Sequence, residues 1–234
     1  MRKIFVLCAI FLGLSPNAWG TSANLTFTKL TDVTGGSPAA TAVYRASLDS
    51  LGLSSIQSIT IQDNSAGLGG AAGQFSGFDL DAIVLSKTSI AAATSVGSLS
   101  DLAVFDYGNA IFAPGTQRLP TDPKLFGTGP SGNTVDNAVA TLGVFDGNST
   151  TAIPGASGFI SMGDGGKLSF NLSSLTSTSG LYLYIGEVGD NGEVASGTIS
   201  ISDQPVNATP EPSTLMLLGA GLAGLVFARR KVIK

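Results

Sequence analysis

Apolar and polar residues alternate along most of this chain, and no other feature constrains its fold as strongly. In the segment 167–172, Leu168, Phe170 and Leu172 fall on one face of an extended chain, and polar residues fall on the other. The segment 181–185 repeats the pattern. A period of two residues is typical of a strand with one buried face. The sequence therefore predicts half-buried β-strands.

Turn-forming residues separate ten such segments, as in Asp63-Asn64, Asp146-Gly147-Asn148 and Asp164-Gly165-Gly166. No long amphipathic helix is predicted, and Ser89–Ser95 is expected to form at most one helical turn. Many short antiparallel strands favour an all-β, two-sheet sandwich, jelly-roll-like or immunoglobulin-like. The predicted strands are 25–29, 41–46, 56–62, 78–85, 102–106, 138–145, 158–162, 167–172, 181–185 and 198–201.

The first twenty residues have the pattern of a secretory signal peptide. Arg2-Lys3 precedes an apolar stretch from Ile4 to Leu14, and Ala18-Trp19-Gly20 places small residues three and one before a predicted cut after Gly20. A second candidate cut follows Ala23. The only cysteine, Cys8, lies in this segment. The exported protein is therefore expected to contain no disulfide and no thiol.

The C-terminal segment carries a three-part pattern. Pro210, Glu211 and Pro212 disfavour helix, so a helix is expected to begin only after Pro212. The apolar run from Leu215 to Ala228 would form roughly 21 Å of helix, which is short against a hydrocarbon core of about 30 Å. The cations Arg229, Arg230 and Lys231 follow it, and they favour the cytoplasmic side.

Together, these three parts closely resemble the PEP-CTERM sorting signal of Gram-negative bacteria. The resemblance implies recognition by an exosortase, a membrane protease-transpeptidase that cuts near the Pro-Glu-Pro and removes the helix. It also implies an exported protein that resides transiently in the inner membrane and then at the cell surface or outside the cell, in an organism that builds extracellular polysaccharide. The alternative is an ordinary C-terminal membrane anchor.

We therefore predict a signal peptide at 1–20, a sandwich domain at 21–207 and the sorting signal at 208–234. Residues 21–209 contain six basic and fifteen acidic residues, a net charge of about −9. Such an acidic body has no patch suited to nucleic acid.

The available side chains restrict the possible chemistry. The chain has no histidine, and its one cysteine lies in the signal peptide, so the usual general base and the usual zinc ligands are missing. A carboxylate pair could still hydrolyse a glycosidic bond. Most carboxylates, however, lie beside Gly or Asn in predicted turns. We therefore expect no enzymatic activity.

Two groups of acidic residues are candidate ligands for calcium. Asp79 and Asp81 lie two residues apart on a predicted strand, so both point to one face, and their charges need a cation or hydrogen-bond donors. The segment around them looks like a strand of calcium-containing carbohydrate-binding jelly rolls. Glu187, Asp190 and Glu193 surround a Gly-rich turn whose oxygens could hold a hard cation, the alternative being a solvated turn.

These observations favour an exported, exosortase-processed protein that is a non-catalytic structural or adhesive component of the extracellular matrix, associated with exopolysaccharide, biofilm or floc. A calcium-dependent carbohydrate-binding module is the alternative, and a secreted carboxylate-type glycosidase is the second alternative. Exposed aromatic side chains on a sheet face would favour sugar binding. Carboxylates paired across a cleft would favour the glycosidase.

Overall fold

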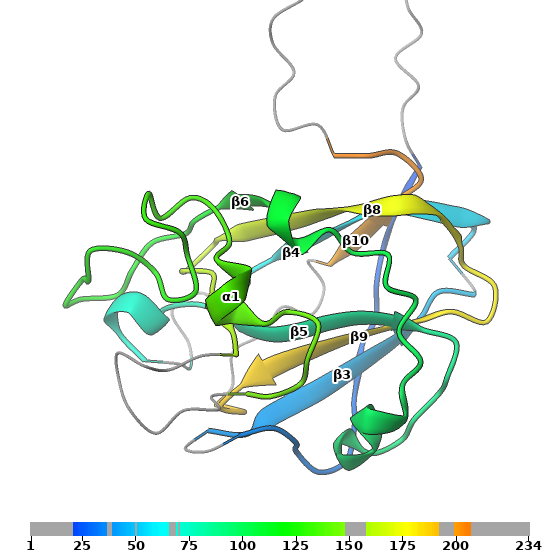
Figure 1. Ribbon diagram of the computed structural model, residues 1–234, viewed down its shortest axis with the longest axis horizontal. Helices are drawn as coiled ribbons and strands as arrows, with labels where there is room; N and C mark the ends of the chain where they lie inside the picture. The colour runs from blue at the N-terminus through cyan, green and yellow to red at the C-terminus, as the bar shows by residue number, and fades with distance from the viewer. Residues whose placement is uncertain are drawn as a thin grey trace, which may run out of the picture.

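The structure, a computed structural model, describes residues 21–36, 39–49, 51–65, 69, 71–147, 158–191 and 199–206. These residues form two five-stranded antiparallel sheets packed face to face, which confirms the predicted sandwich (Figure 1). The predicted sorting segment, including Pro210, Glu211, Pro212 and the run from Leu215 to Ala228, lies outside the described residues.

The first sheet has the strand order β1-β10-β4-β8-β6, and the second has the order β2-β3-β9-β5-β7. The short edge strands limit the unpaired backbone that each sheet presents. The strands are β1 (Ser22–Asn24), β2 (Thr28–Lys29), β3 (Thr41–Ser47), β4 (Ser55–Gln62), β5 (Asp79–Ser86), β6 (Ile111–Ala113), β7 (Ile160–Ser161), β8 (Lys167–Ser177), β9 (Tyr182–Val188) and β10 (Ser200–Ser202). The helical turns are η1 (Gly73–Phe75), η2 (Ala93–Ser98), η3 (Tyr107–Asn109) and α1 (Asn137–Ala140).

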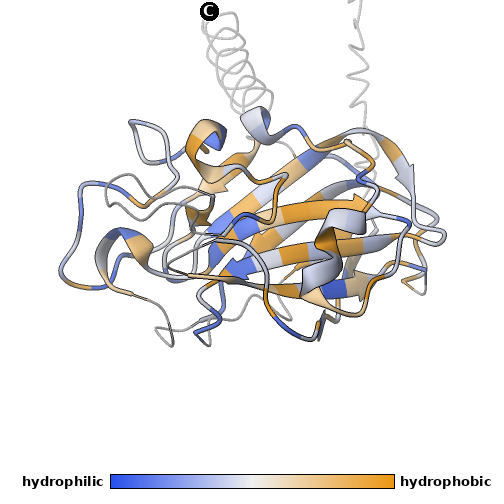
Figure 2. Ribbon diagram, turned by 60° about the horizontal axis from the view of Figure 1, so that its bottom comes forward, coloured by the Kyte–Doolittle hydropathy of each residue, from blue (hydrophilic) through white to orange (hydrophobic). Residues whose placement is uncertain are grey.

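The core lies between the two sheets and contains the apolar residues of the alternating pattern. Leu168 and Phe170 of β8 contact this core with no exposed surface, as do Leu183 of β9 and Ile59 of β4. Figure 2 shows hydrophobic and hydrophilic residues alternating along the strands. Burial of these side chains, worth roughly 25 cal/mol per Å² of apolar surface, is the main force that holds the sheets together.

Two predicted strands are absent from the structure. Residues 102–106 cross from the second sheet, where Leu102 N donates to Leu85 O, to the first, where Ser173 N donates to Val104 O. Ala103 has a φ of 51°, which interrupts the extended backbone. The alternation in 102–106 therefore reflects a connection that packs one side against the core, not a ladder.

The second predicted strand that the structure lacks is 138–145, and this segment begins inside helix α1. The Asp136 carboxylate accepts a hydrogen bond from Ala138 N at 3.2 Å and caps this helix. Thr141 then ends it in the left-handed region. The predicted turn at 89–95 corresponds in part to η2, a 3-10 helix that begins at Ala93.

Close approaches between backbones fix the loops at one end of the sandwich. Gly163 has a φ of 73°, and a Cβ atom added there would lie 2.7 Å from the carbonyl carbon of Gly115. Gly77 is equally restricted, because its Cβ would lie 2.3 Å from the carbonyl carbon of Gly163. Glycine is the residue that permits such contacts.

Candidate functional site

Asp79 and Asp81 lie on the same strand, β5, as predicted, and both are buried. Hydroxyl and backbone donors approach their carboxylates. Ser161 Oγ donates to Asp79. Thr41 Oγ1 donates to Asp81 Oδ2 at 2.6 Å, and Gly147 N donates to Asp81 Oδ1 at 2.9 Å. Hydrogen-bond donors, which the sequence pattern requires as the alternative to a cation, are therefore present at both carboxylates.

The Asp81 carboxyl has an unusual protonation equilibrium. Its pKa is raised to about 7, chiefly by burial and in smaller part by the nearby Asp146 carboxyl, through its charge and through a hydrogen bond between the two carboxyls. The donors Thr41 and Gly147 act in the opposite direction. Gly186 of β9 makes room for this group, since a Cβ added there would lie 2.7 Å from Thr41 Cγ2 and 3.1 Å from Asp81 Oδ2.

The second acidic group is not assembled by the described residues. Glu187 is buried and is paired in register with Leu80, whereas Asp79 and Asp81 alternate with Leu80 along β5 and point to the other face. Asp190 forms an ion pair with Lys29 on the surface, where such pairs contribute little to stability. Glu193 lies outside the described residues.

Among the residues that the structure describes, no group of three or more His, Cys, Asp or Glu side chains could hold a metal ion. Calcium therefore stays a prediction, with Asp79, Asp81, Glu187, Asp190 and Glu193 as its candidate ligands.

The sequence pattern gives no sign of the structural importance of Asp63, because its position before an asparagine indicates only a turn. Its buried carboxylate accepts hydrogen bonds from Phe78 N at 3.0 Å and Gly165 N at 2.8 Å, and from the backbone and hydroxyl of Ser65. One carboxylate thus joins the end of β4 to the start of β5 and to the turn before β8.

Arg118 and Asp164 form a second connection at this end of the molecule. Arg118 Nε lies 3.0 Å from both carboxylate oxygens of Asp164, and Nη2 lies 2.6 Å from Oδ1. Both side chains are mostly buried, with 17% and 24% exposed. Two-point contact fixes the guanidinium and gives a stronger ion pair than a single contact does. The partly buried ion pair therefore indicates a structural role for Arg118 and Asp164.

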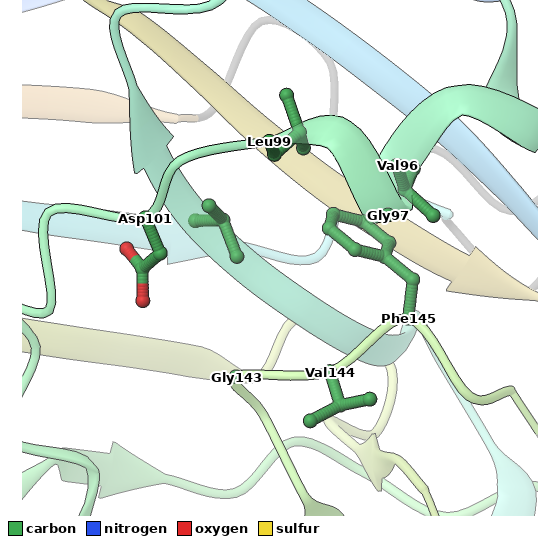
Figure 3. A pocket seen from close by; sticks show the side chains of 8 residues that line it. Val96, Gly97, Leu99, Asp101, Gly143, Val144 and Phe145 are labelled. Carbon is green, nitrogen blue, oxygen red and sulfur yellow. The ribbon is translucent and has the colours of Figure 1, made fainter.

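Two surface hollows accompany the second sheet. The first, of about 340 Å³, lies between η2 and the segment 143–145 (Figure 3). Its lining is largely apolar, with Val96, Leu99, Val144 and Phe145, and Asp101 is the one charged residue among the described residues that line it.

The second hollow, of about 300 Å³, is polar and lies over β2 and β3. Thr26, Thr28, Ser47, Arg45, Tyr182 and Leu51 line it. The guanidinium carbon of Arg45 lies 5.6 Å from the centroid of the Tyr182 ring, a cation–π contact. Arg45 Nη1 also donates to Ile90 O at 2.6 Å, which holds the side chain in place. An aromatic ring, a fixed cation and three aliphatic hydroxyls therefore surround this hollow, and none of the described residues that line it is a carboxylate.

The two ends of the described chain lie together at the edge of the first sheet. Strand β1 pairs with β10, and Thr21 N donates to Asp203 Oδ1 at 2.9 Å. Further along, Asn171 Nδ2 donates to Val206 O at 2.8 Å, and Val206 N donates to Asn171 Oδ1 at 2.7 Å. Ser58 Oγ donates to Gln204 O at 2.7 Å. The chain is thus attached to the sheet up to Val206.

This geometry distinguishes the two candidate signal-peptide cuts. A cut after Gly20 leaves the new Thr21 ammonium beside the Asp203 carboxylate, where a charged hydrogen bond forms. A cut after Ala23 removes that contact and two of the three residues of β1. We expect the protein released by its native host to begin at Thr21 and to end between Pro210 and Ser213.

Intact-mass measurement of the secreted protein checks this expectation. A mass that corresponds to an Asn24 start contradicts the N-terminal part. Recovery from the medium of a species that retains 215–234 contradicts the C-terminal part.

Comparisons with known proteins identify the C-terminal segment. A family model, the PEP-CTERM protein-sorting motif, matches residues 208–231. The comparisons with curated proteins and with solved structures give no significant match. Among the described residues, no helix is long and apolar enough to cross a membrane. The matched residues begin two positions after the clamped Val206, and they contain the Pro-Glu-Pro, the apolar run and the cations of the sequence pattern. The chain therefore carries a PEP-CTERM sorting motif at its C-terminus, which implies an exported, cell-surface-associated protein that is sorted and processed by an exosortase.

Proposed function

We propose that the released sandwich is a non-catalytic structural or adhesive component of the extracellular matrix and that it associates with exopolysaccharide. The sorting motif supports the location. The main support for the absence of catalysis is that buried or partly buried carboxylates hold the fold together through hydrogen bonds. Asp63, Asp81 and Asp164 each join separate segments of the chain through hydrogen bonds.

The composition of the two hollows also supports the absence of glycosidase activity. A glycosidase needs two carboxyl groups about 5 to 10 Å apart across its substrate. Among the described residues, the hollow beside η2 has Asp101 as its one acidic residue, and the hollow over β2 and β3 has none. Neither therefore offers an acid and a nucleophile or base to the same glycosidic bond.

The composition of the hollow over β2 and β3 favours carbohydrate binding as a second candidate function, one that does not require calcium. Aromatic rings offer sugars an apolar face, and Tyr182 is held beside Arg45 here. The exposed hydroxyls of Thr26, Thr28 and Ser47 can exchange hydrogen bonds with sugar hydroxyls. The Arg45 cation favours a polysaccharide that carries carboxylate groups.

One experiment tests both candidate functions. The processed protein is incubated with exopolysaccharide purified from its host, and we expect cosedimentation without release of reducing ends. Sustained release that carboxylate substitutions abolish would contradict the absence of catalysis. Failure to cosediment would contradict the association with polysaccharide.

Variants assign the binding to the hollow. We expect Tyr182→Ala to weaken cosedimentation by roughly twofold to tenfold, because aromatic ring contacts are worth about 0.5 to 1.5 kcal/mol, and Thr28→Val to weaken it less. Thr94→Val is the matched control, since Thr94 is exposed on η2 and does not line this hollow. Binding that survives Tyr182→Ala in a folded protein would place the polysaccharide elsewhere.

A further inference from the structure

The first sheet differs from the second in charge. Its five strands contain no Asp or Glu, and Lys167 is their single charged residue. The strands of the second sheet contain three carboxylates, which are all buried (Asp79, Asp81 and Glu187), and two cations (Lys29 and Arg45). Residues 21–209 as a whole carry a net charge of about −9, and the five strands of the first sheet contribute none of the acidic residues.

The outer face of the first sheet is formed by small, uncharged polar side chains. The apolar residues of β4, β8 and β10 point into the core, so the alternate residues point outward. These include Ser58, Thr60, Ser169, Asn171, Ser200 and Ser202. The outer face of the second sheet, by contrast, is covered by apolar contacts. Val43, Val84 and Tyr184 pack there against Ile90, which precedes η2, and Ala93, the first residue of η2.

The chain runs from this face toward the sorting motif. Residues 203–206 lie over the β8 layer (Figure 1) and are held there by Ser58 and Asn171. Asn171 makes two reciprocal bonds to Val206 and so acts as a clamp on the chain. Thr21, the expected first residue of the exported protein, lies at the same edge.

The distance from the clamp to the motif is short. Pro210 follows Val206 by four residues, which span at most about 14 Å when fully extended. The apolar run begins at Leu215, nine residues after Val206, so it starts within roughly 32 Å of the clamp. While the apolar run is in the membrane, the sandwich is therefore held close to the bilayer surface by a point on its first sheet.

We propose that the outer face of the first sheet is the surface that faces the bilayer while the precursor awaits its exosortase, and that the Asn171 clamp fixes this orientation. The sorting motif follows the chain that leaves from this face. Lipid phosphates repel carboxylates, but the strands of this sheet carry none, and Asp203 at its edge accepts a hydrogen bond from Thr21 N. The second sheet then points away from the membrane. This orientation belongs to the precursor and does not depend on what the released protein binds.

Site-specific fluorescence tests the orientation. Residues 21–234 contain no cysteine, so a single introduced cysteine gives a unique label. Gln62→Cys places a fluorophore on an exposed position of the first sheet, and Thr94→Cys places it on η2, over the second sheet. The labelled chain, residues 21–234, is inserted into vesicles of phosphatidylethanolamine and phosphatidylglycerol that carry a headgroup energy acceptor. We expect energy transfer from position 62 to be clearly stronger than from position 94.

Two further variants test whether the short connection to the motif and the Asn171 clamp cause this orientation. A flexible Gly/Ser insert of about twenty residues after Val206 has a root-mean-square reach of roughly 25 Å, and we expect it to abolish the difference between the two labels. Asn171→Ala, checked for folding by circular dichroism, is expected to reduce the difference. Equal transfer from both positions in the uninterrupted chain, or stronger transfer from position 94, would overturn the orientation. A difference unchanged by Asn171→Ala would overturn the role of the clamp.

Discussion

Replacing Asp63 by alanine is expected to lower the free energy of unfolding by about 2 to 4 kcal/mol. The substitution leaves the buried N–H of Phe78 and the buried Ser65 without their acceptor, and it disconnects the turn at Gly165. Asp63→Asn is expected to cost nearly as much. Both carboxylate oxygens accept N–H donors, and an amide NH2 in place of either oxygen would face a donor.

Urea unfolding of the processed protein measures this effect, with Asp106→Ala as the matched control. Asp106 is exposed and accepts from the backbone and side chain of Asn109 at the start of η3. Loss of such an exposed cap costs about 1 kcal/mol or less. Equal losses for the two alanine variants would show that Asp63 is no more than an ordinary turn residue.

The two-sheet sandwich could be predicted because it depends on a local, repeated signal. Alternation in 167–172 and 181–185 identifies β8 and β9, and the turns around Asp63 and Asp164 separate the strands. The failures have physical reasons. Residues 102–106 alternate as a strand does, but they connect the sheets without joining a ladder. The strands β1 and β6 are only three residues long, and partners distant in sequence determine them.

The functional residues likewise fall into those that a local pattern identifies and those that only the fold brings together. The sorting motif is contiguous, so residues 210–231 identify it without a fold. The neighbours of Asp81, in contrast, come from three segments that the fold assembles: Thr41, Asp146-Gly147 and Gly186. Strand geometry places Asp79 and Asp81 on one face, but it does not show what covers that face. The same holds for the pairing of Arg45 with Tyr182, two residues far apart in sequence.

The Asp81 carboxyl is expected to make the protein more stable as the pH falls from about 7 toward 4. Its pKa is raised from 3.8 to about 7 in the folded protein by burial and by the Asp146 carboxyl, so the folded state binds the proton more tightly than the unfolded state does. The contribution is complete below the unfolded pKa and is lost as the pH rises through the folded pKa. A difference of about 3 units corresponds to about 4 kcal/mol.

The Asp81→Asn variant isolates this contribution from the other titrating groups. An amide mimics the protonated acid, and its NH2 can donate to the Asp146 carboxylate while its oxygen accepts from Gly147. We therefore expect the variant to exceed the parent in stability by a few kcal/mol at pH 8, with the difference shrinking toward pH 4. Denaturant unfolding of both proteins from pH 4 to 8.5 measures it. A difference that stays constant over this range would contradict the raised pKa.

The same pair of proteins also separates protonation from calcium. A proton on Asp81 and a calcium ion bound to Asp79 and Asp81 are competing ways to neutralise one strand face, and they have opposite pH dependences, because calcium needs the ionised carboxylate. If protonation is the mechanism, melting of the parent at pH 8 is the same with calcium and with a chelator, and Asp81→Asn raises the melting temperature in both. If calcium is the mechanism, the ion stabilises the parent at pH 8 and Asp81→Asn removes that gain. Because the donors Thr41 and Gly147 already contact both oxygens of Asp81, we expect the first result.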